Sequence, residues 1–159
     1  MTPFLILDID PALLDAERAR VIPALRAALP HAEVFEVGST AIPGVIGKGD
    51  LDILARAPLE RFDETRAALD ALHPRNPDQL SNAQYQGYAV DSPLDVAIQL
   101  TVTGGAYDDF EPFLEALRAD PSLIEAYNTL KRRWHGRPMD DYRAAKRAFI
   151  EAVLTDLKG

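Results

Sequence analysis

Residues 34–54 constrain the chain most, because two short apolar runs are joined there by a loop of small residues. The first run, residues 34–37, stops at Gly38, and the second, residues 50–54, begins with two carboxylates one residue apart. Side chains at i and i+2 of a strand share a face, about 6.6 Å apart. Asp50 and Asp52 are therefore predicted to project together. A divalent cation between them would relieve their repulsion.

Length and composition fit one domain. The chain has 159 residues, 47% of them hydrophobic, and a chain near this size buries roughly 68–70% of its unfolded surface. We expect a single domain over residues 1–159, with a sheet-containing core in 1–105 and a helical C-terminal part in 106–159. Cysteine is absent, which excludes thiolate zinc sites and a cysteine nucleophile.

The net charge of −8 argues against an extended nucleic-acid partner, which requires a basic surface. A small phosphorylated ligand held by a few local cations remains compatible with it. The N-terminus lacks the pattern of a signal peptide, and no run of about 18 apolar residues occurs. We therefore expect a cytoplasmic protein without a membrane partner.

The hydrophobic pattern predicts an α+β fold: a mixed sheet of four to five strands with flanking helices and a helical segment closing over the carboxylates. An edge strand is expected at residues 4–9, and a kink or break at Pro23 of the first helix. Strands are expected at residues 33–37, 51–55, 84–90 and 94–102, and helices at 11–29, 58–72, 108–119, 121–134 and 140–157.

The last predicted strand adds a third carboxylate. Leu94, Val96 and Ile98 alternate with polar or small residues, so Asp95 is expected on the opposite face from them. Asp95 follows Ser92 and Pro93 closely, so a plain surface position at the strand edge is also compatible with the sequence.

These features together resemble the nucleotidyltransferase superfamily, in which a Gly-Ser pair ends one strand, a carboxylate pair begins the next, and a third carboxylate follows. More narrowly, residues 37–44 (VGSTAIPG), Lys48 and residues 51–53 resemble the GrpB-like proteins, also called UPF0157. Residues 127–132 and 142–150 resemble the ending of that family. The resemblance implies a nucleotidyltransferase-like fold over most of the chain.

The chain departs from the family pattern in two places. Many GrpB-like members carry a proline and an aliphatic residue where Gly49 and Asp50 stand here. They also tend to have histidines in the strand corresponding to residues 94–102, which here contains Asp95 and no histidine. Both departures bring this chain nearer to an active nucleotidyltransferase.

Nucleotidyl transfer needs triphosphate charge neutralised and an acceptor hydroxyl activated, which two divalent ions can do. Asp50 and Asp52 are predicted to hold Mg²⁺ or Mn²⁺ with the nucleotide. Asp95 would complete a second metal site and accept the acceptor's proton.

The nucleoside triphosphate, the predicted substrate, would be bound by the small-residue loop and nearby cations. Gly38 allows close approach, and Ser39 and Thr40 donate hydrogen bonds to its phosphates. Lys48 and Lys131 add positive charge, the latter from a basic group that also includes Arg143, Lys146 and Arg147.

Ordinary structural roles are also open for these residues: a plain turn at residues 38–40, surface carboxylates, a surface lysine at 48, and a solvated basic helix face.

Three functions are compatible with these features. The first is a metal-dependent nucleotidyltransferase with an unknown small-molecule or protein acceptor. The second is a non-catalytic module that binds a nucleotide or CoA precursor, prompted by GrpB-like proteins fused to dephospho-CoA kinase. The third is a partner-binding protein of a two-component pair.

Overall fold

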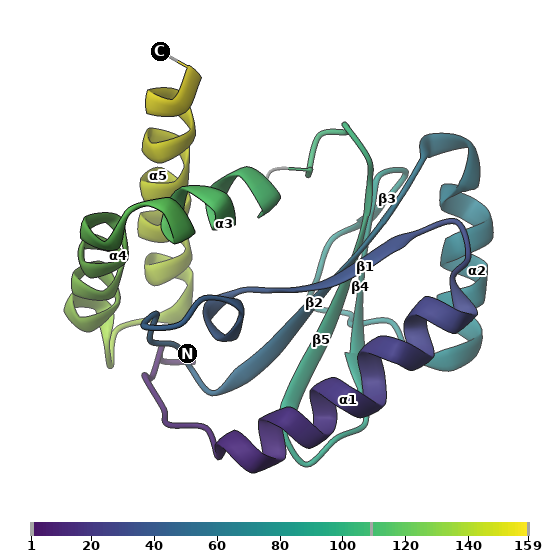
Figure 1. The fold of residues 1–159 in the computed structure, drawn as a ribbon, viewed down its shortest axis with the longest axis horizontal. Coiled ribbons are helices and arrows are strands. Elements are labelled where there is room, and N and C mark those ends of the chain that lie inside the picture. Colours follow the sequence, from purple (N-terminus) through teal and green to yellow (C-terminus); the bar gives the residue numbers. More distant parts are fainter. Residues whose placement is uncertain (1, 109, 159) are drawn as a thin grey trace.

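A five-stranded sheet forms the centre of the structure, a computed structural model that describes residues 2–108 and 110–158, without the side chain of residue 158 (Figure 1). The strand order is β1-β2-β5-β4-β3, and only β2 and β5 run parallel. The strands are β1 (Glu33–Val37), β2 (Asp50–Ala57), β3 (Ser81–Asn82), β4 (Tyr85–Val90) and β5 (Asp95–Val102). The helices are α1 (Pro11–Ala28), α2 (Phe62–Leu72), α3 (Phe110–Ala119), α4 (Pro121–Trp134) and α5 (Met139–Lys158), with short 3₁₀ turns η1 (Ser39–Ala41) and η2 (Leu59–Arg61).

The mixed α+β architecture predicted from the sequence is confirmed, including the hairpin of β4 and β5. The edge strand expected at residues 4–9 is wrong. Phe4 instead stacks on Tyr142 of α5 with ring centroids 3.7 Å apart, and its backbone bonds to Arg137 and Gly136. This aromatic contact holds the N-terminal segment beside the start of α5, away from the sheet.

One face of the sheet is an apolar core beneath α1 and α2. Leu51 and Ile53 of β2 and Ile98 of β5 are fully buried there. Helix α1 begins at Asp10, whose side chain accepts a hydrogen bond from the backbone N–H of Ala12. Pro23, expected as a kink or break, lies inside this continuous helix.

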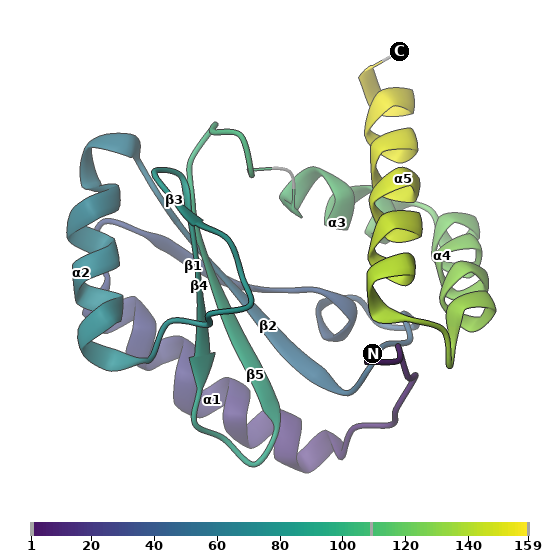
Figure 2. The ribbon, with the colours of Figure 1, turned by 180° about the vertical axis from the view of Figure 1, so that it is seen from behind.

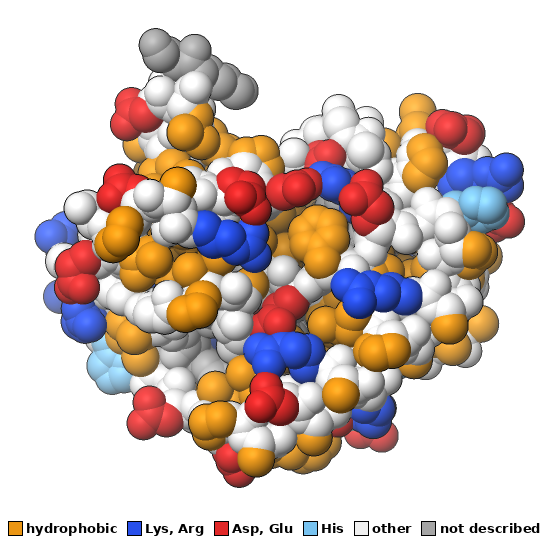
Figure 3. Space-filling view, viewed as in Figure 1, with side chains coloured by type: hydrophobic (Ala, Val, Ile, Leu, Met, Phe, Trp, Pro, Cys, Tyr) orange, Lys and Arg blue, Asp and Glu red, His pale blue; other side chains and the backbone are white. Residues whose placement is uncertain are grey.

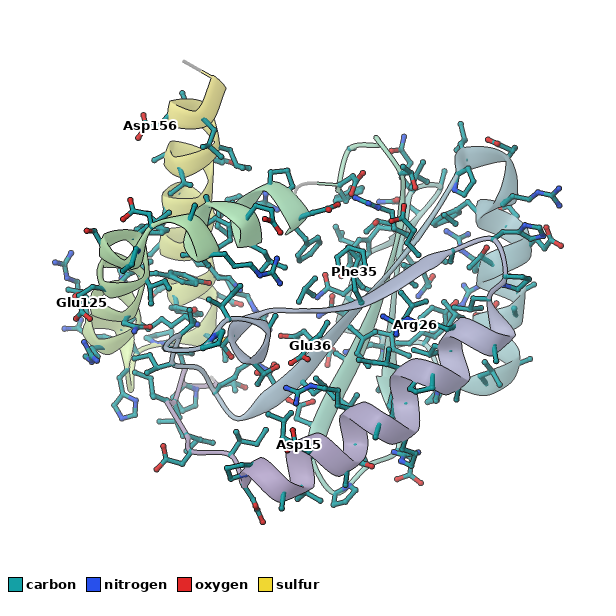
Figure 4. The ribbon with its side chains drawn as sticks, in the orientation of Figure 1. Asp15, Arg26, Phe35, Glu36, Glu125 and Asp156 are labelled. Carbon is teal, nitrogen blue, oxygen red and sulfur yellow. The ribbon has the colours of Figure 1, made fainter. Side chains whose placement is uncertain are left out.

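Helix α1 is also attached to β1, which is an edge strand of the sheet. Arg18 pairs with Glu36 at 2.5 Å and with Asp15 at 2.6 Å, and Arg26 donates two hydrogen bonds to the Val34 carbonyl. Figure 3 shows acidic and basic side chains gathered between α1 and β1 on this side of the molecule, and Figure 4 labels Asp15, Arg26 and Glu36 among them. These contacts cover an edge that would otherwise be open to pairing with another strand.

The three C-terminal helices form a separate group on the other face. Figures 1 and 2 show α3, α4 and α5 together, apart from α1 and α2. The rings of Phe113, Tyr127 and Phe149 pack on one another and, with neighbouring apolar residues, against Val37 and Leu54 of the sheet. Within the described residues, no helix has the length and apolar character needed to cross a bilayer.

Candidate functional site

The three predicted aspartates lie on the sheet face that carries the C-terminal helices. Asp50 and Asp95 are the first residues of β2 and β5, and they stand opposite each other in the parallel pair. Residues in register share a face, and Asp52 follows on the same face as Asp50. Asp50 is only 5% exposed, whereas the Asp95 side chain is 69% exposed. The structure thus places Asp50 inside the site and Asp95 at its rim.

Lys48 joins two of these carboxylates. Its Nζ lies 2.9 Å from Oδ2 of Asp50 and 3.4 Å from Oδ2 of Asp95. Burial opposes the charged form, but the negative charges of Asp50, Asp95 and Asp52 raise the pKa of Lys48 above its ordinary value. Lys48, predicted to contact phosphate, therefore serves as a counter-ion between the two strands in this structure.

Asp52 is half-buried and has a different environment. Among the described residues, its side chain has no hydrogen bond or ion pair. Burial, followed by the charge of Asp50, raises the pKa of Asp52 to about 7, although Lys146 and Lys48 act in the opposite direction. Asp52 is therefore a carboxylate whose charged form lacks a close partner.

The small-residue loop passes directly over Asp52. Gly38 has φ of 76° and ψ of −165°, a conformation that essentially only glycine adopts, and a Cβ there would lie 2.5 Å from Oδ2 of Asp52. Ser39 and Thr40 follow in the turn η1, and the Thr40 hydroxyl is buried without a hydrogen-bond partner in the described part of the chain. The backbone at Gly38 therefore passes close to the Asp52 carboxylate, whereas the sequence predicted its close approach to the phosphates of a nucleotide.

Helix α4 holds the far part of this loop. The Asn128 side chain accepts a hydrogen bond from the Ile46 N–H at 3.0 Å and donates one to the Gly44 carbonyl at 2.7 Å. Lys131, also predicted to bind the nucleotide, is 4% exposed and donates to the Ile46 carbonyl at 2.5 Å. Burial and then the charge of Lys146 lower the pKa of Lys131 to about 7. Lys131 therefore stabilises the loop through its contact with the Ile46 carbonyl.

A cleft of about 330 Å³ lies between β5 and the helices α3 and α5. A smaller hollow shares several of its lining residues and continues to Gly38 and Asp52. Among the residues that the structure describes, those that line the cleft include three cations and no carboxylate: Gln99, Phe110, Phe113, Arg143, Lys146, Arg147 and Ile150.

Gln99, Phe110 and Phe113 were not predicted as site residues, because a glutamine in a strand and aromatic residues in a helix have no distinctive spacing. The spacing of the cations in the sequence does indicate that they lie together. Arg143, Lys146 and Arg147 have the i, i+3, i+4 spacing of one helix face.

The arrangement offers a divalent ion two carboxylates, and water or phosphate oxygens would complete its coordination. Within the described residues, no group of three or more His, Cys, Asp or Glu side chains could hold a metal ion by itself. Magnesium, however, commonly uses one or two carboxylates and completes its coordination with water and phosphate oxygens. Asp50 and Asp52 supply such a pair, with Asp52 still lacking a cationic partner.

Comparison with known proteins reveals relatives over nearly the whole chain. Residues 8–156 match the family model described as GrpB protein. A UPF0157 protein of Vibrio cholerae serotype O1 is 34% identical over 131 residues, which are 82% of this chain and 70% of that protein. The crystal structure of the conserved protein GrpB from Enterococcus faecalis matches with a TM-score of 0.71 at 17% identity, over 98% of this chain and 100% of that one.

The fold is also similar to that of a terminal nucleotidyltransferase. A structure of Cid1, described as having RNA terminal uridylyl transferase activity, matches with a TM-score of 0.53 and 15% identity, over 77% of this chain and 40% of Cid1. Identity this low shows the fold alone. The α+β fold is therefore of the nucleotidyltransferase type, as the sequence predicted.

Proposed function

The chain belongs to the GrpB family, and from this premise we propose that it is a metal-dependent nucleotidyltransferase that uses a nucleoside triphosphate. One observation carries the proposal. Asp50, Asp52 and Asp95 share a sheet face at the start of two adjacent parallel strands, beside the Gly38 loop. The hollow next to Asp52 leads into a cleft lined by cations.

The residues around the cleft have complementary tasks. Backbone N–H groups and hydroxyls at Ser39 and Thr40 bind the phosphates, because the short loop presents several donors together. Lys146 and Arg143 neutralise phosphate charge from the side of α5. Asp50 and Asp52 would hold a divalent ion, Mg²⁺ or Mn²⁺, which neutralises charge on the triphosphate.

The transfer itself conserves atoms and charge. An acceptor hydroxyl oxygen forms a bond to the α-phosphorus, the bond between that phosphorus and the bridging oxygen breaks, and pyrophosphate leaves. Asp95 accepts the hydroxyl proton, because its exposed position at the rim is reachable from solvent by an acceptor.

A second candidate is a module that binds a nucleotide or a CoA precursor without transferring any group. The position of Lys48 favours it, because an ammonium between Asp50 and Asp95 neutralises the site without a metal. Binding of the phosphates would then depend on the loop and the α5 cations alone.

Calorimetry tests the first step. Wild-type protein is titrated with ATP, CTP, GTP and UTP in the presence of magnesium, alongside Asp52→Ala and the control Asp156→Ala, an exposed carboxylate near the end of α5 (Figure 4). We expect at least one nucleotide to bind wild type and the control but not Asp52→Ala. Absence of binding by wild type to all four nucleotides would contradict the transferase and would leave only a CoA precursor as the ligand of the second candidate.

A transfer assay separates the two candidates. The protein is incubated with α-³²P-labelled nucleotide and a cell extract as the source of acceptors, and pyrophosphate release and label transfer are measured. Label on an acceptor supports nucleotidyl transfer. Tight binding with neither product favours the binding module.

A further inference from the structure

Lys48 is the part of the site that the transferase reaction does not explain. The ammonium contacts Asp50 and Asp95 at once, so it occupies the gap between the first residues of β2 and β5. A metal ion bound to Asp50 would bring a second positive charge to the same carboxylate. Two cations this close repel each other strongly in a partly buried site.

The structure also offers Lys48 a second location. Its side chain is 36% exposed and lines a cavity of about 480 Å³. The charged groups facing that cavity are Asp78, Asp140 and Arg143, so two carboxylates there can receive the ammonium and one guanidinium opposes it.

We propose that Lys48 is an internal counter-ion that neutralises the aspartates in the free protein and competes with the metal ion for them. The inference rests on the proposed function, since it describes how the same site is kept charge-balanced until a metal and nucleotide arrive. Lys48 is thus a regulator of metal entry, and its removal strengthens metal binding.

The expected size of the effect follows from the charges. A single charge within about 4–6 Å commonly shifts a protonation equilibrium by 1–3 pKa units, which is a factor of roughly 10–1,000. A neighbouring ammonium should disfavour a divalent ion at the same carboxylates by at least the lower end of that range. Removing it should therefore tighten metal binding by about tenfold or more.

The test uses Mn²⁺ alone as the probe. Calorimetric titrations compare wild type with Lys48→Gln and with Arg132→Gln, a control that removes an exposed cation paired with Glu125 on α4. We expect Lys48→Gln to bind Mn²⁺ at least about tenfold more tightly than wild type. The control should match wild type. Lys48→Met is measured in parallel in case the glutamine variant fails to fold.

Thermal unfolding gives an independent readout. In the presence of a chelator, Lys48→Gln should have a lower Tm than wild type, because Asp50 and Asp95 lose the ammonium that contacts both. Added Mn²⁺ should raise its Tm more than that of wild type, since a ligand stabilises in proportion to its affinity.

Equal or weaker Mn²⁺ binding by both Lys48 variants than by wild type would overturn the inference. The same proteins are then titrated with Mn²⁺ and a nonhydrolysable nucleoside triphosphate. If wild type binds the nucleotide and the Lys48 variants have unchanged metal affinity, only the role of Lys48 as a competing counter-ion is contradicted. If neither wild type nor the variants bind the nucleotide, the proposed function is contradicted.

Discussion

The two faces of the sheet differ although they share the same strands. Toward α1 and α2, β2 and β5 present Leu51, Ile53 and Ile98, none of which reaches solvent. One residue away along β2, Asp50 and Asp52 lie on the opposite face, and Asp52 lines a hollow beside the C-terminal helices. The alternation of the strands thus separates residues that stabilise the fold from residues available for chemistry.

The polar face carries an energetic cost that the apolar face does not. Burial and the charge of Asp50 raise the pKa of Asp52 to about 7, and burial with the charge of Lys146 lowers the pKa of Lys131 to about 7. Both shifts oppose the charged form of the group. Groups held in this way are typical of functional sites, where a ligand compensates the cost.

The largest effect is expected on the polar face. Asp52→Asn should lower nucleotidyl transfer by more than about 100-fold, since residues that only support a metal ligand already cost about 10–100-fold. The measurement is label transfer from α-³²P nucleotide, with Asp156→Asn as the control. Transfer by Asp52→Asn at the wild-type rate would show that this face is not the reaction site.

The same substitution should stabilise the free protein at alkaline pH. Burial raises the pKa of Asp52 to about 7 in the native state, whereas the ordinary pKa of an aspartate is 3.8. Between these values the native state binds more protons, so wild-type stability falls as pH rises. Melting curves in a chelator at pH 5 and pH 8 should show a smaller loss in Asp52→Asn. An equal loss in both proteins would contradict the raised pKa.

A substitution on the apolar face should lower the stability of the protein and leave nucleotide binding nearly unchanged. Ile98→Ala should lower the free energy of unfolding by about 2–5 kcal/mol, because it leaves a cavity among fully buried side chains. Denaturant unfolding measures the loss. Nucleotide affinity, measured by calorimetry well below the Tm, should remain within about twofold of wild type. A large loss of affinity in the folded variant would mean that the two faces are coupled.

Gly38→Ala should affect both stability and binding. The alanine must adopt a glycine-only conformation, at about 1–3 kcal/mol, and its Cβ would meet the Asp52 carboxylate. The control is Gly104→Ala, which has φ of 71° but nothing within 4 Å of the added Cβ. Both should unfold at lower denaturant concentration, and only Gly38→Ala should lose nucleotide affinity. Equal affinity in the two variants would remove Gly38 from the site.

The smallest effect is expected at the α5 wall of the cleft. Lys146→Gln should weaken nucleotide binding by about tenfold, corresponding to the loss of one charged contact with phosphate. Arg133→Gln, an exposed residue of α4, is the matched control. Calorimetry at two salt concentrations should show a weaker salt dependence for Lys146→Gln than for the control. Unchanged nucleotide affinity in Lys146→Gln would mean that the phosphates do not bind at the α5 wall of the cleft.

Much of this contrast was predictable from local patterns. Alternation in residues 94–102 correctly assigned Asp95 to the face opposite Ile98, and the glycine after β1 correctly marked the end of that strand. These features depend on neighbours within a few residues, which the sequence contains directly.

The rest depends on contacts between distant segments. The parallel pairing that sets Asp50 opposite Asp95 has no local signature, so the site of Lys48 between them was not predictable. Lys131 and Arg132 look alike in the sequence, yet only Lys131 faces inward to the loop that Asn128 also holds. Which side chains of a helix face inward depends on the segment that packs against the helix, and the sequence of the helix alone does not contain that information.

A crystal structure with Mn²⁺ and a nonhydrolysable nucleoside triphosphate tests most directly the claim that the polar face is a nucleotide site. We expect anomalous manganese density in contact with the carboxylates of Asp50 and Asp52, and the triphosphate between residues 38–40 and α5. Manganese density absent from these carboxylates, or a nucleotide bound outside the cleft, would contradict it.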